Sequence, residues 1–360
     1  MEPDELTALG VYDCTAEDAP ARLELLDYVT ALGATAEELV AYRDMLPALA
    51  GRLAIRDGPV LTIEQAAKLS GLSTDQVRLL ARAAGLPDPE PGARVLTEGF
   101  VALAEGMKAV MAVFGEDVAF QLLRVLGSSM ARVADAVVSA FLVNVEPGAR
   151  REEGALGIAR ANVEAAALLP RVASVLDILF RQHLLSAQRP ATVDADLVGY
   201  ETRQLVVGFV DLVGSTELGE ELSIRDLGAA LTSFERLSTD AITNRGGRVV
   251  KLIGDEILYT TPDASSACTI ALDLAHTFSH HPLIPPVRVG LATGEVVHRD
   301  GDVFGTVVNL AARAVKAGLP GEVIATSEVA VNSGVRREPL GRRPLKGFVN
   351  PIELYRLLGK

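Results

Sequence analysis

The sequence predicts a chain of two fold classes, an all-helical half followed by an α/β or α+β half. Two observations predict this division. In the first half, alanine and leucine dominate and apolar residues recur at steps of three and four, the period of a helix with one buried face. In the second half, short strand-like runs alternate with helical stretches, a pattern typical of a sheet covered by helices. A chain of 360 residues is long enough for two domains that each bury a core.

The change of pattern near residue 190 places the domain boundaries. Residues 1–187 are predicted to form the helical domain, and residues 201–360 the mixed domain. The segment between them, 188–200, contains Pro190 and is predicted to be a linker. The clearest helical pattern is the run TEGFVALAEGMKAVMAVFGEDVAFQLLRVLGSSMARVADAVVSAFL, which contains glycines but no proline. We expect this run to be helical.

Strands and helices alternate in the mixed domain. The strand-like runs are QLVVGFVDL, GRVVKLIGDEILYTT, PVRVGLATGEVVHR and GEVIATSEVA. Helical stretches lie between them, such as RDLGAALTSFERLSTDAITNRG and SSACTIALDLAHTFSHH. This order predicts a sheet with helices packed against it.

Composition and charge narrow the class of protein. The composition is 49% hydrophobic and 22% charged, and no apolar run reaches the roughly 18 residues of a membrane helix. The opening MEPDELTALG lacks the basic and apolar regions of a signal peptide, so a soluble, cytoplasmic protein is expected. The net charge of −13 argues against a nucleic-acid partner, because phosphate binding relies on clustered Lys and Arg. Cys14 and Cys268 lie in different halves without metal-ligand spacing, which argues against zinc or disulfide roles.

The first motif with chemical content is VVGFVDLVGSTEL. A buried-strand pattern runs into Asp211, and Gly214, Ser215 and Thr216 then open a helix. A carboxylate at a strand end, followed by small residues whose backbone N–H groups face outward, suits a metal-bound polyphosphate. The alternative is that Asp211 only ends the strand and that Ser215 or Thr216 only caps the helix.

The second motif is the hairpin RVVKLIGDEILY. Gly254 precedes Asp255 and places this aspartate at the tip of the hairpin, where it could face the strand end that carries Asp211. Two carboxylates at that point could hold two divalent cations against a triphosphate, the arrangement used in phosphoryl chemistry. Glu256, one residue later, is expected on the other face as a solvated or structural charge.

The third motif is GDVFGTVVNLAARAVKAG. Asp302, Asn309 and Arg313 follow one another at steps of seven and four, so Asn309 and Arg313 lie one turn apart on one face of a helix. Taken alone, this motif also fits a helix with one capping aspartate and a surface Asn and Arg.

Together the three motifs resemble the catalytic domain of class III nucleotidyl cyclases. FVDLVGST, KLIGDEI and GDVFGTVVNLAAR occur in the order of that family, and the resemblance covers roughly residues 201–360. It implies an α+β domain with a ferredoxin-like, palm-type sheet. It also implies a homodimer that converts ATP into 3′,5′-cyclic AMP and pyrophosphate at sites built from both chains. Each site would use two divalent cations, Mg²⁺ or Mn²⁺.

The resemblance also implies roles for six residues. Asp211 and Asp255 of one chain would be the metal ligands. Lys251 and Asp302 of the other chain would bind the adenine. Asn309 and Arg313 of that second chain would orient the ribose and stabilise the transition state. The stretch RRPLKGFVNPIELYRLL resembles the closing hairpin of the same domain. Its Lys346 is either a phosphate ligand or a surface lysine.

Hydrogen-bonding chemistry favours ATP over GTP. Adenine offers an acceptor at N1 and a donor at its amine, which match a donating Lys251 and an accepting Asp302. Guanine presents the reverse pattern. It would leave buried polar groups unpaired, at a cost on the order of 1–3 kcal/mol.

The helical half contains a segment that resembles a helix-turn-helix, residues 61–87. Thr62 caps a first helix, Gly71 makes the turn, and Ser73 or Thr74 caps a second helix. The second helix carries two arginines and one aspartate in an acidic protein. A DNA-binding role and a purely structural module both remain open, and the charge favours the structural module.

As a whole, the helical half resembles the N-terminal regulatory region of some actinobacterial adenylyl cyclases, which inhibits the catalytic dimer according to pH. A response near neutrality would most simply use histidine, and His183 lies where the last helix meets the linker. We hypothesise that protonation of His183 shifts the dimer toward its active form at acid pH. The alternative is an exposed histidine without a regulatory role. A second function also remains open, a nucleotide-sensing regulator with a cyclase-like fold that binds DNA or a partner protein.

Overall fold

The computed structural model divides the chain into two compact units, residues 1–190 and 191–360. It describes residues 1–88, 90, 92–187 and 201–359. The predicted linker, residues 188–200, lies outside the described residues, and so do the side chains of Thr216 and Glu217.

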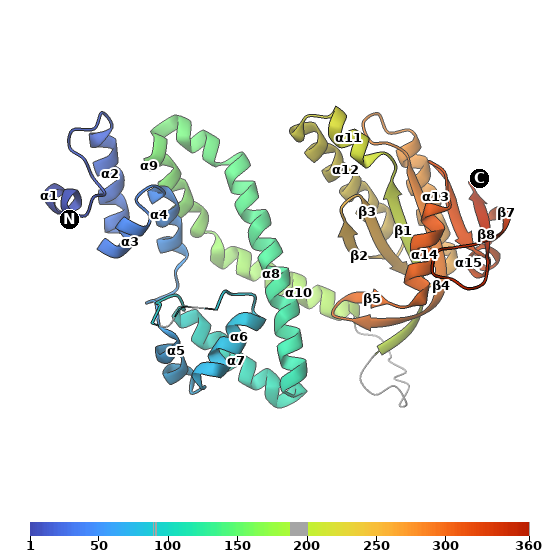
Figure 1. Ribbon diagram of the computed structural model, residues 1–360, viewed down its shortest axis with the longest axis horizontal. Helices are drawn as coiled ribbons and strands as arrows, with labels where there is room; N and C mark the ends of the chain where they lie inside the picture. The colour runs from blue at the N-terminus through green and yellow to red at the C-terminus, as the bar shows by residue number, and fades with distance from the viewer. Residues whose placement is uncertain (89, 91, 188–200, 360) are drawn as a thin grey trace. The chain divides into compact units, whose positions relative to one another are not determined.

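The first unit is helical throughout its described elements (Figure 1). Its helices, in chain order, are α1 Pro3–Ala8, α2 Ala19–Ala31, α3 Ala36–Ala41, α4 Leu46–Ile55, α5 Ile63–Ser70, α6 Thr74–Ala83, α7 Glu98–Phe114, α8 Glu116–Asn144, α9 Glu146–Ala166 and α10 Leu169–Ala187.

The helical unit has two separate cores. One joins the helices α1–α4 to α9 through buried leucines such as Leu26 and Leu49 and the alanine Ala159. The other joins α5, α6 and α7 to the start of α8, where Phe120 and Leu123 are buried. The rest of α8 and all of α10 contribute no buried residue.

The α5–α6 pair has the local structure that the sequence predicts. The side chains of Thr62 and Ser73 each accept a hydrogen bond from the backbone N–H of the glutamine three residues later. The side chain of that glutamine in turn accepts a hydrogen bond from the backbone N–H of the Thr or Ser. Gly71 ends α5 with φ of 65°, a backbone conformation that glycine adopts without strain. On α6, Arg78 forms an ion pair with Asp88 at 2.7 Å. The DNA-binding role of this pair stays a prediction.

The long apolar run predicted to be helical is helical and forms two helices. Gly115, with φ of 83°, ends α7 and begins α8. By length and composition, α8 could cross a membrane, since its most apolar window has a mean hydropathy of 1.4 and no buried residue. No unbroken apolar run of 18 residues occurs in α8, as expected from the sequence, so the helix passes this test by its average hydropathy. One such helix is weak evidence for a membrane span, and the cytoplasmic location stays a prediction.

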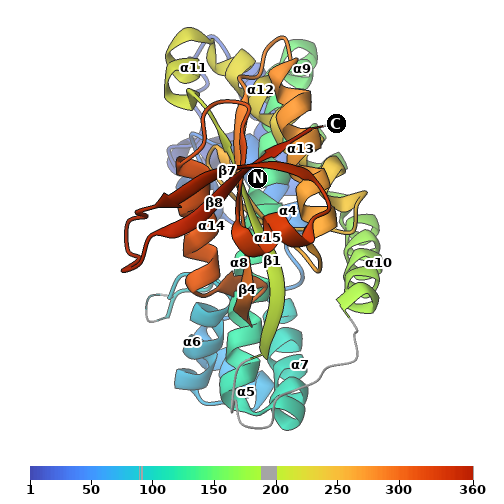
Figure 2. The same ribbon diagram turned by 90° about the vertical axis from the view of Figure 1, so that its right-hand side faces the viewer.

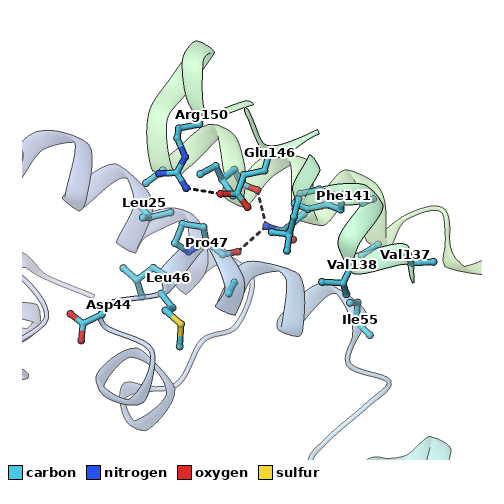
Figure 3. A pocket seen from close by; sticks show the side chains of 18 of the residues that line it. Leu25, Asp44, Leu46, Pro47, Ile55, Val137, Val138, Phe141, Glu146 and Arg150 are labelled. Carbon is cyan, nitrogen blue, oxygen red and sulfur yellow. Dashed lines mark hydrogen bonds and ion pairs between the residues drawn. The ribbon is translucent and has the colours of Figure 1, made fainter. Parts of the chain in front are cut away.

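A pocket of about 640 Å³ lies in the helical unit (Figure 3). α4, α8 and α9 line it with apolar side chains that include Leu46, Val138 and Phe141. Glu146 and Arg150, which also line it, form an ion pair at 2.5 Å. The volume lies in the range of roughly 300–1,000 Å³ that is usual for small-molecule pockets.

The second unit is a sheet with helices on both faces. Its elements, in chain order, are β1 Glu201–Leu212, α11 Ser215–Glu221, α12 Ile224–Thr243, β2 Arg248–Ile253, β3 Glu256–Thr261, α13 Ala264–Ser279, β4 Val287–Arg299, β5 Asp302–Phe304, α14 Thr306–Lys316, β6 Val323–Thr326, α15 Ser327–Asn332, β7 Arg336–Arg343 and β8 Ile352–Leu358.

The strands form one mixed sheet in the order β2-β3-β1-β4-β6-β8-β7, and β5 pairs with β4. The β4–β6 pair is parallel and the other described pairs are antiparallel. α12, α13 and α15 pack on one face and α14 on the other, and Figure 2 shows α13 and α14 on opposite sides of the sheet. The prediction of an all-α half before an α+β half is confirmed.

Side chains along β1 point alternately to the two faces of the sheet, so neighbouring residues belong to different cores. The even-numbered residues Val206, Val210 and Leu212 belong to the core under α12 and α13. The odd-numbered residues Leu205, Val207 and Phe209 belong to the core under α14. The next odd-numbered residue is Asp211, so its carboxylate lies on the α14 face at the end of a buried row.

α14 packs on β4 at backbone distance. A Cβ atom added to Gly290 would lie 2.2 Å from the Val315 nitrogen and 2.5 Å from the Ala311 oxygen. These are backbone atoms of α14, which cannot rotate away as a side chain can. The glycine therefore fixes the distance between this helix and the sheet.

We predict that Gly290→Ala destabilises the second unit by about 2–3 kcal/mol, because overpacking against backbone forces the helix off the sheet. Urea unfolding of the full chain measures this change. The matched control is Gly228→Ala on α12, where an added Cβ meets no atom within 4 Å. The control should leave stability unchanged or raise it by up to about 1 kcal/mol. Equal urea midpoints for the two variants would contradict the prediction.

Candidate active site

Three charged residues form a row across neighbouring strands. Asp211 of β1 lies directly opposite Glu256 of β3 and opposite Arg288 of β4. Directly opposite residues of antiparallel strands point to the same face. The row therefore lies on the α14 side of the sheet. The predicted placement of Glu256 on the other face is wrong. Of its two predicted roles, a solvated or a structural charge, the structural one fits, since Glu256 is half-buried beside Asp211 and paired with Lys316.

Asp211 is buried and bonded on both oxygens. Only 3% of the residue is exposed. Its Oδ2 accepts a hydrogen bond from Arg288 Nε at 2.5 Å, and its Oδ1 accepts one from Lys316 Nζ at 2.8 Å. Lys316, the last residue of α14, also donates to Glu256. A buried carboxylate is thus neutralised by two cations from two different elements.

The pKa values of this cluster follow from burial and charge. Burial raises the pKa of Asp211, but the hydrogen bonds from Lys316 and Arg288 outweigh it and hold this pKa below its usual range. Burial raises the pKa of Glu256, and the bond from Lys316 does not cancel that rise because Asp211 lies alongside. Burial lowers the pKa of Lys316, but its two carboxylate partners outweigh burial and raise it.

The second predicted metal ligand lies in a turn beside the end of β1. Asp255 follows Gly254, whose φ is 62°, in the turn between β2 and β3, as the sequence predicts. The Leu212 amide donates to the Asp255 carbonyl at 3.1 Å, which ties the turn to β1. The Asp255 carboxylate accepts a hydrogen bond from Ser215 Oγ at 2.5 Å. Ser215 opens α11 and Gly214 precedes it in a left-handed conformation, as predicted.

The two aspartates fit a divalent cation that also takes ligands from its substrate. Among the residues that the structure describes, no group of three or more His, Cys, Asp or Glu side chains could hold a metal by itself. Magnesium is usually bound by one or two carboxylates together with substrate phosphates. The buried Asp211 carboxylate, which already binds the cationic groups of Arg288 and Lys316, is suited to such a site.

The predicted base-binding pair is assembled within one chain. Lys251 of β2 and Asp302 of β5 form an ion pair with Nζ and Oδ2 2.5 Å apart. The other Asp302 oxygen accepts from the backbone N–H of Val303 at 2.8 Å. A cationic donor and an anionic acceptor thus stand side by side with partly exposed side chains.

Asn309 and Arg313 lie on the exposed face of α14, one turn apart as predicted. Neither side chain has a hydrogen-bond or ion-pair partner within the described part of the chain. Both are therefore free to contact a substrate or another chain.

A basic cavity of about 630 Å³ adjoins this face of α14. Its charged lining consists of one acidic residue and five basic ones, which are Glu322, Arg313, Lys316, Arg343, Lys346 and Arg356. Glu322 is paired with Arg356 at 2.7 Å. The excess of positive charge suits a phosphate-bearing ligand.

Sequence reasoning missed two members of the cluster. Lys316 lies seven residues after Asn309 and three after Arg313, so helical spacing alone could have placed it on the same face. Arg288 has no such signal, since its role depends on the pairing of β4 with β1.

The two units match two different family models. Residues 6–186 match the adenylate cyclase regulatory domain, and residues 198–359 match the adenylate and guanylate cyclase catalytic domain. The chain belongs to the adenylate cyclase family. The predicted family and the predicted class of enzyme, an adenylate cyclase, are thereby confirmed.

Relatives of this cyclase include proteins with and without a described activity. An uncharacterised protein of Mycobacterium tuberculosis is 35% identical over 99% of this chain and 94% of its own length. An adenylate cyclase of Streptomyces coelicolor is 36% identical over 69% of this chain and 65% of its own. A pH-sensitive adenylate cyclase of M. tuberculosis is 27% identical over 93% of this chain and 87% of its own.

One solved structure, the adenylyl cyclase CyaB of P. aeruginosa, aligns with 45% of this cyclase and 96% of its own chain. The identity is 23% and the TM-score is 0.41. A likeness of this degree carries no argument about function.

We predict that Asp211→Asn destabilises the catalytic unit by roughly 3 kcal/mol at pH 7, because it removes the buried carboxylate that balances the charges of Arg288 and Lys316. The folded pKa of Asp211 is lowered, so its contribution is complete above the ordinary carboxyl pKa of about 3.9 and is lost as the pH falls through the folded pKa. The difference between the urea midpoints of wild type and Asp211→Asn should therefore be the same at pH 7 and pH 5 and should disappear below about pH 4. A difference that grows on acidification would contradict this assignment.

Proposed function

We propose that this cyclase converts ATP into 3′,5′-cyclic AMP and pyrophosphate as a homodimer, with each active site built from both chains. The observation that carries the choice of substrate is the Lys251–Asp302 ion pair at 2.5 Å. A lysine donor next to a carboxylate acceptor complements the N1 acceptor and the amine donor of adenine. Guanine offers a donor at N1 and an acceptor at O6, which would face like partners.

The chain's own residues have separate roles in the reaction. The ribose 3′-oxygen attacks the α-phosphorus, the bond from that phosphorus to the β-phosphate oxygen breaks, and the hydroxyl proton passes to solvent. Asn309 orients the ribose, and Arg313 stabilises the charge that develops on the α-phosphate. Both side chains are exposed on α14 and free to do so.

Asp211 and Asp255 would hold two divalent cations, Mg²⁺ or Mn²⁺, with the triphosphate completing their coordination. Bound there, the cations neutralise the triphosphate and lower the pKa of the attacking hydroxyl. Gly214, Ser215 and Thr216 would approach the phosphates from the start of α11. The cavity lined by Arg313 and Lys346 supports a role for Lys346 as a phosphate ligand.

The distribution of these residues supports a site shared between two chains. In one chain, α14 reaches Asp211 through Lys316, whereas Asn309 and Arg313 have no side-chain partner within the residues described. A second chain related by a two-fold axis would place its Asn309 and Arg313 opposite the aspartates of the first.

We predict that Asp255→Asn and Arg313→Ala are each inactive alone, with a loss of at least about 100-fold, and that mixing them restores activity. Random pairing makes about half of the dimers mixed, and each mixed dimer has one intact site out of its two. Restored activity should therefore approach about a quarter of the wild-type value. Cyclic AMP formed from Mn²⁺ and ATP by co-expressed chains measures it.

The control pair is Asn309→Ala with Arg313→Ala, because both changes affect the same half-site. This mixture should remain inactive. Sites contained within single chains would instead leave both mixtures inactive, even where mixed dimers are detected by differential tagging.

Regulation by the helical unit is the second part of the proposal. A relative described as pH-sensitive aligns with 93% of this chain, across both units. A site shared between chains exists only when the chains dock correctly, so a helical unit that alters docking changes activity without touching the site. His183 is exposed on α10, four residues before the end of that helix, and its protonation adds a positive charge there.

We predict that wild-type activity rises between pH 8 and about pH 5.5 and that His183→Ala flattens this rise, because alanine cannot take up the proton. The ratio of initial rates at the two pH values measures the effect. His280→Ala, an exposed histidine of the catalytic unit, is the control and should keep the wild-type ratio. An unchanged pH profile in His183→Ala would remove this residue as the sensor.

A further inference from the structure

Both oxygens of Asp211 already have a cationic partner in the folded chain. Arg288 Nε bonds Oδ2 and Lys316 Nζ bonds Oδ1. A divalent cation bound to either oxygen at about 2.1 Å would lie next to a positively charged nitrogen. Like charges at such a distance repel strongly in a buried site, so one of the two partners has to leave.

Arg288 is held in place by the sheet. It lies directly opposite Asp211 on the neighbouring strand, and 27% of its side chain is exposed. Its planar guanidinium is also preorganised for the carboxylate that it contacts. Displacement of Arg288 would break the contact that joins the buried Asp211 to β4.

Lys316 is the partner that can leave. It is the last residue of α14, 47% of its side chain is exposed, and a flexible four-carbon stem carries its ammonium group. Space for the displaced side chain also exists, because Lys316 lines the basic cavity of about 630 Å³.

The Lys316 ammonium group occupies the place of a shared cation. It bonds Asp211 of β1 and Glu256 of β3, two carboxylates that lie opposite each other in the register. Without a positive charge between them, the buried Asp211 and the half-buried Glu256 would repel each other. A divalent cation at the same point would supply the positive charge that both carboxylates need.

We propose that Lys316 is a tethered cation that holds Asp211 and Glu256 together until a divalent cation displaces it, and that it thereby sets the metal concentration at which the site fills. The inference rests on the proposed function only in assigning Asp211 to metal binding. Lys316 is a positioning residue here, since it acts through the two carboxylates.

The experiment measures Mn²⁺ binding to the full chain without nucleotide, by the loss of the electron paramagnetic resonance signal of free Mn²⁺. Lys316→Gln is compared with Arg236→Gln, which removes one positive charge from an exposed ion pair on α12 of the same unit. If Lys316 occupies the site more than nine-tenths of the time, its removal should lower the Kd for Mn²⁺ by about tenfold or more. The control should stay within about twofold of wild type.

A second measurement separates displacement from a general change of charge. Without metal, Lys316→Gln should unfold at a lower temperature than wild type, and saturating Mn²⁺ should raise its Tm by more than it raises that of wild type. Lys316→Met, which keeps the aliphatic stem, should behave as Lys316→Gln does.

Two outcomes overturn the inference. One is a Kd for Lys316→Gln within twofold of that for Arg236→Gln. The other is the absence of Mn²⁺ binding to wild type and both Lys316 variants. Tighter Mn²⁺ binding without any cyclic AMP formation would instead reject the proposed function and leave the inference standing.

Discussion

A carboxylate at the buried end of β1 has to be neutralised, and much of the catalytic unit is arranged around that requirement. Asp211 continues a row of apolar residues that face α14, so it cannot turn to solvent without leaving the sheet. Its charge is balanced by Arg288 across the strand pair and by Lys316 from the end of α14. One side chain therefore links two strands and a helix.

The carboxylate cluster gathers at the end of β1, whereas Asp302 of the base-binding pair lies opposite Arg299 at the other end of β4. The hydrogen bond from Leu212 to Asp255 brings the β2–β3 turn to the end of β1, and Ser215 at the start of α11 holds the carboxylate of that turn. The last turn of α14, much later in the chain, contributes Arg313 and Lys316. Elements distant in sequence thus meet where β1 ends.

Local pattern was enough to predict the fold class, the hairpin tip and the helical face of Asn309 and Arg313. Glu256 was misplaced because alternation was counted from Asp255, which lies in the turn and not in the pleat. Counted from the pairing with β1, Glu256 falls on the face of Asp211. Arg288 depends in the same way on strand order, which no single segment encodes. A search of the sequence for an unbroken apolar run does not single out α8. Charged residues interrupt that helix, but the mean hydropathy of its most apolar window is still 1.4.

The contact between Gly290 and α14 limits how this enzyme can be controlled. Backbone lies against backbone there, so the helix that carries Asn309, Arg313 and Lys316 cannot slide or tilt over β4 without a collision or a void. A regulatory signal therefore cannot act by moving α14 relative to the sheet of the catalytic unit. It must move the unit as a single rigid body, and the position of that whole body is then the variable that a regulator can adjust.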